Sequence, residues 1–177
     1  MSTMKVLICQ EIKNLVWEVW ERPVPGDNEA LIKIKTVGIC GTDIHAWAGN
    51  QPFFSYPRVL GHEICGEIIE SGKNIHNFNI GQQVAVIPYI SCQQCPACKS
   101  GRTNCCEKIS VIGVHQDGGF SEYLSVPVAN ILPADGIDPQ AAALIEPFAI
   151  SAHAVRRAAI APSEQVLVVG AGPIGLG

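Results

Sequence analysis

The sequence predicts a mainly β fold with some α-helices, followed by the beginning of an α/β unit. Three observations support this prediction. Short runs rich in valine and isoleucine alternate with turn signals over the first half of the chain. An alanine-rich segment opens with Asp138-Pro139, and an apolar stretch, VLVVG, leads into a glycine-rich turn near the end. With 177 residues, of which 47% are hydrophobic and 16% charged, the chain can bury a sizeable core.

The predicted strands follow one another along the first 127 residues. In EALIKIKTV, residues 29–37, Ile32, Ile34 and Thr36 share one face while Lys33 and Lys35 point the other way, as in a half-buried strand. Turn signals such as VPGDNE and SGKN separate the runs, which favours a β-barrel or sandwich. The runs are MKVLIC (4–9), LVWEVW (15–20), EALIKIKTV (29–37), EICGEIIES (63–71), QQVAVIP (82–88) and GGFSEYLSVP (118–127).

Helices are predicted after residue 138. Asp138 is a typical N-cap and Pro139 suits the first helical position before an alanine-rich run. Pro147 disfavours helical geometry at Glu146 and is expected to start a second helix that continues to about Arg157. Glu146 is therefore expected at a helix break.

Composition excludes several classes of partner. The formal charge of −4 and the sequence pI near 5.7 provide no basic face for nucleic acid. The amino-terminal apolar run is too short for a secretory signal, and no run approaches the roughly 20 apolar residues that span a bilayer. We therefore expect a cytoplasmic protein that binds neither nucleic acid nor membrane. Of its eight cysteines, we expect the clustered ones to serve metal binding or catalysis rather than disulfides, and Cys9 and Cys65 to be buried thiols in apolar strands.

A cysteine-rich loop predicts a structural zinc site. Cys92, Cys95, Cys98 and Cys106 combine two successive CxxC steps with a fourth thiol eight residues later, which suits tetrahedral Zn²⁺. Cys105 competes with Cys106 for the fourth position. Four thiolates leave no open coordination position, so this zinc would hold the loop together without doing chemistry.

A second group of residues predicts a catalytic zinc. Cys40, His62, Glu63 and Glu146 supply one thiolate, one imidazole and carboxylates, a mixture that suits Zn²⁺ with an open position. Such a metal lowers the pKa of a bound hydroxyl, so that an alcohol ionised near neutral pH can give up a hydride from its carbon.

The stretch GICGTDIHAW, residues 38–47, is expected to combine a ligand with a proton route. Thr42 can pass a proton from a zinc-bound alkoxide through its hydroxyl, and His45, one helical turn further, can hand it to solvent. Asp43 either orients its neighbours or is simply an acidic residue near a helix start.

The last residues carry a nucleotide-binding signature. Gly170, Gly172 and Gly175 follow the apolar stretch in the GxGxxG arrangement, which allows a tight turn, approach of a pyrophosphate and close helix packing. The acidic residue about 20 positions further on, which would select NAD over NADP, lies beyond Gly177. We expect this chain to hold the zinc chemistry without turning over by itself.

Taken together, GHExxGxxxxxGxxI at 61–75, CGTDIH at 40–45, the four-cysteine loop and VLVVGAGPIG closely resemble the zinc-dependent medium-chain dehydrogenases, which include alcohol, sorbitol and threonine dehydrogenases. The resemblance implies a GroES-like catalytic domain over residues 1–150. It also implies that residues 151–177 form a linker helix and the first strand and glycine turn of a Rossmann NAD(P)-binding domain. It implies a homo-oligomer for the complete protein.

The resemblance also limits which residues are expected to bind the catalytic metal and which type of reaction is expected. Glu146 stands where liver-type alcohol dehydrogenases carry a cysteine, as in the polyol and threonine branch, in which either Glu63 or Glu146 is the metal ligand. The implied function is oxidation of a secondary hydroxyl of a sugar acid or polyol with NAD(P)⁺, with two zinc ions per chain, one catalytic and one structural. A zinc-free reductase and a non-catalytic, zinc-stabilised binding module are the alternatives.

Overall fold

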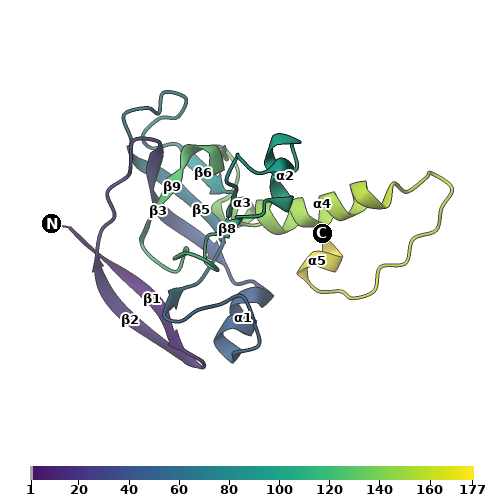
Figure 1. Ribbon diagram of the computed structural model, residues 1–177, viewed down its shortest axis with the longest axis horizontal. Coiled ribbons are helices and arrows are strands. Elements are labelled where there is room, and N and C mark those ends of the chain that lie inside the picture. Colours follow the sequence, from purple (N-terminus) through teal and green to yellow (C-terminus); the bar gives the residue numbers. More distant parts are fainter. Residues whose placement is uncertain (1) are drawn as a thin grey trace.

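Three β-sheets and several short helices make up the fold, seen in a computed structural model that describes residues 2–177 (Figure 1). The sheets have the strand orders β2-β1-β4, β10-β6-β5-β3-β9 and β7-β8. The strands are β1 (Thr3–Glu11), β2 (Asn14–Glu21), β3 (Glu29–Gly38), β4 (Arg58–Val59), β5 (Glu63–Ser71), β6 (Gln83–Val86), β7 (Tyr89–Ile90), β8 (Ser110–Val111), β9 (Tyr123–Pro127) and β10 (Ile131–Pro133). The helices are α1 (Gly41–Ala48), α2 (Pro96–Lys99), α3 (Pro139–Ala143), α4 (Ile145–Ala158), α5 (Pro173–Leu176) and the 3₁₀ turns η1 (Thr103–Cys105) and η2 (Val128–Asn130).

Each of the six predicted runs contains a strand, and the predicted mainly β fold is confirmed. β1 and β2 form an antiparallel hairpin, and β2 is the edge of its sheet. Alternation along β2 leaves Leu15, Trp17 and Val19 exposed on one face. In Figure 1 this hairpin lies at the end of the molecule opposite α4 and α5.

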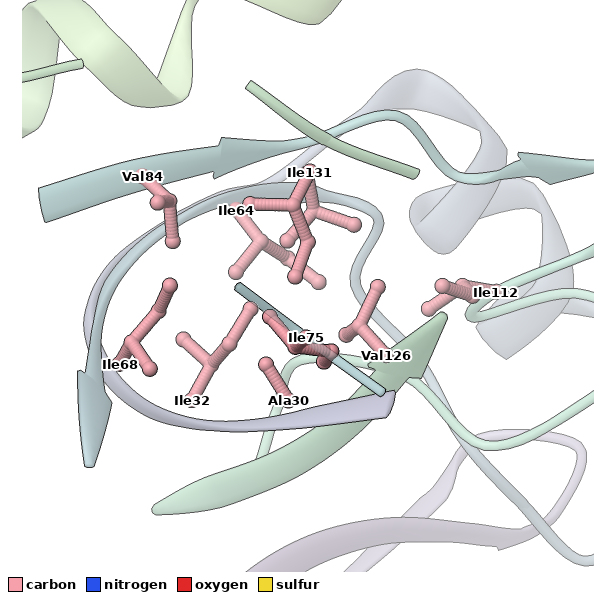
Figure 2. Packing of buried hydrophobic residues seen from close by; sticks show 10 residues of the cluster. Ala30, Ile32, Ile64, Ile68, Ile75, Val84, Ile112, Val126 and Ile131 are labelled. Carbon is pink, nitrogen blue, oxygen red and sulfur yellow. The ribbon is translucent and has the colours of Figure 1, made fainter. Parts of the chain in front are cut away.

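The main core lies inside the five-stranded sheet, where the β-branched residues of the predicted strands converge (Figure 2). Alternation along β3 and β5 places Ile32, Ile64 and Ile68 on the inner face, each with at most 1% of its surface exposed. The buried members of this cluster are Ala30, Ile32, Ile64, Ile68, Ile75, Val84, Val86, Ile112, Val126 and Ile131.

Ile68→Ala is expected to destabilise the chain by about 2–5 kcal/mol, because it leaves a cavity among close-packed neighbours. Urea unfolding with zinc held constant measures the change. Ile80→Ala removes the same atoms from a side chain that is 62% exposed and is the matched control. It should change stability by less than about 0.5 kcal/mol. Equal losses in the two variants would contradict this account of the core.

Pairing of β3 with β5 brings together residues of the candidate metal site. The antiparallel register places Gly38, the last residue of β3, opposite Glu63, the first residue of β5. Cys40 follows as the N-cap of α1. The sheet therefore brings residues some twenty positions apart in the sequence to one place.

The helical segment differs slightly from expectation. The Asp138 carboxylate caps α3, accepting from the backbone N–H groups of Gln140 (2.9 Å) and Ala141 (3.3 Å), as predicted. The break falls at Leu144, and α4 begins at Ile145, so Glu146 lies in the first turn of a helix rather than between two helices. Pro147 is tolerated there because N–H groups of a first turn have no partner within the helix.

The expected strand over VLVVG, residues 166–170, is not formed, because no neighbouring strand pairs with it within the described residues. These apolar side chains are exposed, as are all residues from 160 to 177. The glycine turn and helix start are present: Gly170 has φ +105°, and α5 begins at Pro173. Within residues 2–177, none of the helices combines the length and apolar character that crossing a membrane requires.

Candidate metal and catalytic site

Three of the four residues predicted for the catalytic zinc come together. Cys40 at the start of α1, His62 just before β5 and Glu63 at the start of β5 place one ligand atom each within 4.8 Å of the others. His62 is 6% exposed and Glu63 is 7% exposed, while Cys40 is half-buried. The cluster is therefore largely shielded from water, with its thiol side the more open.

Asp43 fixes the two backbone segments that carry these ligands. One carboxylate oxygen accepts from the backbone N–H of Cys40 (2.9 Å), and the other accepts from the backbone N–H of Gly61 (3.0 Å). The latter oxygen lies 3.8 Å from His62 Nδ1. Asp43 is 3% exposed. The sequence allowed Asp43 either to orient its neighbours or to be simply an acidic residue near a helix start. These buried hydrogen bonds support the first role.

Glycines create the space that the ligands occupy. A Cβ atom at Gly38 would overlap the Glu63 carboxylate, so a side chain there would displace this ligand. Gly61 has φ +89°, a conformation that L side chains rarely adopt, and a Cβ there would overlap the ring of Phe120. The glycine preceding His62 therefore serves the turn that directs the imidazole inward.

The electrostatics of the cluster favour a cation. Burial opposes protonation of His62, but its hydrogen bond with Cys40 and the acidic charges around it outweigh burial and raise its pKa. Burial raises the pKa of Glu63, and the charge of His62 only partly offsets this. His62 Nδ1 is buried without a hydrogen-bond partner. The donor set of thiolate, imidazole and carboxylate fits Zn²⁺, whose positive charge would take the place of these protons.

The predicted proton route lies on the helix that begins at the cluster. Thr42 is half-buried and His45 is exposed, three residues apart in α1 and so on the same side of this helix. Their relay role stays a prediction. A hollow of about 650 Å³ between the β1–β2 hairpin and α1 is lined by Trp17, Trp47 and Asp43, and none of the three ligand residues lines it.

Glu146 is held outside the three-residue cluster. Its Oε1 atom accepts a hydrogen bond of 2.5 Å from the hydroxyl of Tyr89. Burial and this hydrogen bond raise the pKa of Tyr89. Tyr89 was missed by sequence reasoning, because the two residues are 57 positions apart and belong to no shared motif.

The four-cysteine loop has the geometry expected of a closed metal site. The sulfur atoms of Cys92, Cys95, Cys98 and Cys106 lie within 4.8 Å of one another, and Cys105 is exposed and lies outside this cluster. Backbone N–H groups point at the sulfurs: that of Cys95 lies 3.4 Å from Cys92 Sγ and that of Cys92 lies 3.3 Å from Cys106 Sγ. Backbone donors lower the pKa of Cys95 to about 6, so this thiol is poised to bind metal as thiolate.

These features agree with what comparison with known proteins shows. Residues 26–136 match the alcohol dehydrogenase GroES-like domain, and the chain belongs to this family. Over all 177 residues it is 88% identical to L-galactonate-5-dehydrogenase of Escherichia coli K12, of which it covers 52%. The chain thus spans about half the length of the curated relatives it matches.

Solved structures show the same fold. A short chain alcohol dehydrogenase of Escherichia coli CFT073, complexed with NADH, is 40% identical with a TM-score of 0.93, over 99% of this chain and 52% of that one. A thermostable alcohol dehydrogenase of Pyrobaculum aerophilum, bound to cobalt and zinc, is 30% identical with a TM-score of 0.91, over 99% of this chain and 55% of that one. The GroES-like fold and the zinc-type dehydrogenase relationship are therefore confirmed.

Proposed function

We propose that this chain is the zinc-binding catalytic part of an NAD(P)-dependent alcohol dehydrogenase that oxidises a secondary hydroxyl of a sugar acid such as L-galactonate. The observation that carries the proposal is the buried cluster of Cys40, His62 and Glu63 at the start of α1. The sugar acid is supported by the 88% identity to an L-galactonate-5-dehydrogenase, and oxidation with NAD(P)⁺ by the dehydrogenase relatives.

In this proposal the residues of the chain bind, orient and deprotonate the substrate. When bound, zinc supplies Lewis acidity that lowers the pKa of a hydroxyl in contact with it. Asp43 keeps the Cys40 and Gly61 backbones in place, so that thiolate and imidazole converge. Thr42 takes the hydroxyl proton, and exposed His45 passes it to solvent. Gly170, Gly172 and Gly175 form the turn that would receive the cofactor pyrophosphate.

The domain boundary, cellular location and assembly belong to the same proposal. We divide the chain into a catalytic domain over residues 1–150 and the start of a cofactor domain over residues 151–177. All eight cysteines are free, which suits the reducing cytoplasm. The exposed stripe of Leu15, Trp17 and Val19 on β2 is consistent with a homo-oligomer.

A chimera tests the proposed function directly. Residues 1–177 of this chain would replace the matching residues of the Escherichia coli L-galactonate-5-dehydrogenase, whose remaining half would complete the cofactor domain that begins at residue 151. We expect NAD(P)⁺-dependent oxidation of L-galactonate, with little activity on L-threonine or galactitol, and a loss of at least about 100-fold in kcat/KM with His62→Ala. A folded chimera that binds zinc but oxidises none of these substrates would contradict the proposal.

A further inference from the structure

The contact between Tyr89 and Glu146 bears on which glutamate binds the metal. The Tyr89 hydroxyl donates to Glu146 Oε1 at 2.5 Å, the short distance typical of a hydrogen bond to a carboxylate. Tyr89 belongs to β7 and Glu146 to the first turn of α4, so the bond joins two elements. The bond holds one of the two carboxylate oxygens, so it restrains how far Glu146 can move towards the cluster of Cys40, His62 and Glu63.

The backbone of Tyr89 is held firmly enough to act as an anchor. β7 pairs with β8, with Tyr89 opposite Val111. On the other side, the buried amide of Asn130 donates to the carbonyl oxygens of Ile87 (2.8 Å) and Tyr89 (3.1 Å). Three residues further along the chain, Cys92 enters the four-thiolate loop. The backbone of Tyr89 is therefore fixed by its surroundings independently of Glu146.

Glu146 is nevertheless close enough to affect the electrostatics of the three-residue cluster. Its negative charge contributes to the raised pKa values of both His62 and Glu63. Yet it lies outside the set of ligand atoms that are all within 4.8 Å of one another. A carboxylate in this position can neutralise a bound cation at a distance, or it can move in and become a fourth protein ligand.

We propose that Tyr89 is a positioning residue that withholds Glu146 from the metal, so that Cys40, His62 and Glu63 are the ligands and a coordination position stays open for substrate. The inference rests on the proposed function, because it concerns the same metal. Without the hydroxyl, Glu146 becomes free to take the open position, giving the closed coordination of a site that binds metal tightly but admits no substrate.

A double-mutant cycle on metal affinity tests this inference without relying on activity. The 177-residue chain is first given one equivalent of Zn²⁺, which the four-thiolate loop takes up preferentially because thiolates are soft ligands. Co²⁺ binding to the remaining site is then titrated by its visible absorption. The four proteins are the parent chain, Tyr89→Phe, Glu146→Gln and the double variant. Phenylalanine keeps the ring, so that only the hydroxyl is removed.

We expect Tyr89→Phe to tighten Co²⁺ binding by about tenfold and to change the d–d absorption, as a new carboxylate ligand would. Adding Glu146→Gln should reverse both effects. In the parent background, Glu146→Gln should leave the spectrum unchanged and alter affinity by only about twofold. A merely structural role for Tyr89 would give additive effects and no spectral change.

Two other results would have distinct meanings. Equal effects of Glu146→Gln with and without the Tyr89 hydroxyl, while Co²⁺ still binds, would overturn the inference and leave the proposed function standing. A parent chain that binds no Co²⁺ at the second site, with the loop zinc in place, would overturn the proposed function and the inference with it. Circular dichroism of all four proteins confirms that they share one fold.

Discussion

Replacing Cys98 by alanine is expected to remove one of two zinc equivalents and to unfold the four-cysteine loop, whereas Cys40→Ala removes the other equivalent and leaves this loop intact. The four sulfurs, that of Cys98 among them, hold a loop whose own secondary structure is only the one-turn helix α2 and the 3₁₀ turn η1. A metal present at 1,000 times its Kd stabilises the folded state by about 4 kcal/mol. Cys98→Ala should lose most of this stabilisation. Metal analysis and thermal unfolding measure the two effects.

Cys105→Ala is the matched control for this prediction. Cys105 is adjacent to Cys106 in the same loop, but it is exposed and lies outside the sulfur cluster. It should therefore retain both zinc equivalents and the parental melting temperature. A Cys105→Ala protein that loses zinc, or a Cys106→Ala protein that keeps it, would reassign the fourth ligand. Zinc stoichiometry that stays unchanged in Cys40→Ala would remove the second metal site from the molecule.

Asp43→Ala is expected to damage stability and metal binding together. The substitution leaves the buried N–H groups of Cys40 and Gly61 without their acceptor, at a cost of about 1–3 kcal/mol each. It also frees the two segments that carry Cys40 and His62, so we expect metal affinity at this site to fall about 10–100-fold. Urea unfolding of the metal-free chain and Co²⁺ titration separate the two losses.

Two comparison variants sharpen the Asp43 prediction. Asp43→Asn keeps one side-chain oxygen as an acceptor and should fall between the parent and Asp43→Ala in both measurements. Asp27→Ala removes an exposed carboxylate whose 2.8 Å ion pair with Lys73 lies at the surface. It should change stability by less than about 1 kcal/mol and leave metal affinity unaltered. An Asp43→Ala protein as stable as Asp27→Ala would show that the buried bridge contributes nothing.

The sequence predicted best where a local pattern determines the outcome. Alternation in residues 29–37 and 63–71 anticipates β3 and β5, and the CxxC spacing anticipates the sulfur cluster. The cluster of Cys40, His62 and Glu63 was also anticipated, because the residue types suit one metal. Tyr89 could not be found in this way, since its partner is distant in sequence and a tyrosine after a proline carries no metal signature.

The strand expected at VLVVG did not form, and it shows where a local sequence pattern is not sufficient. Its apolar residues have high β propensity, but a buried parallel strand is stable only between neighbours that supply its hydrogen bonds. None is present beside residues 166–170 within the described chain, and their side chains are exposed. Propensity therefore identified the segment's character without determining its conformation. The prediction that Glu146 lies at a helix break was wrong for a simpler reason. A proline such as Pro147 is as compatible with the first turn of a helix as with a break between two helices.

The crowding of Gly38 against Glu63 has a consequence for how such sequences can diverge. No side chain fits at position 38 while a glutamate carboxylate occupies its present place. The two positions are paired across β3 and β5, so a change in one alters what the other tolerates. We expect descendants of this chain to keep glycine at position 38 for as long as they keep Glu63, and a larger residue there to be accompanied by a smaller one at position 63. Position 38 would then change together with the metal site, although Gly38 supplies no ligand atom to the cluster.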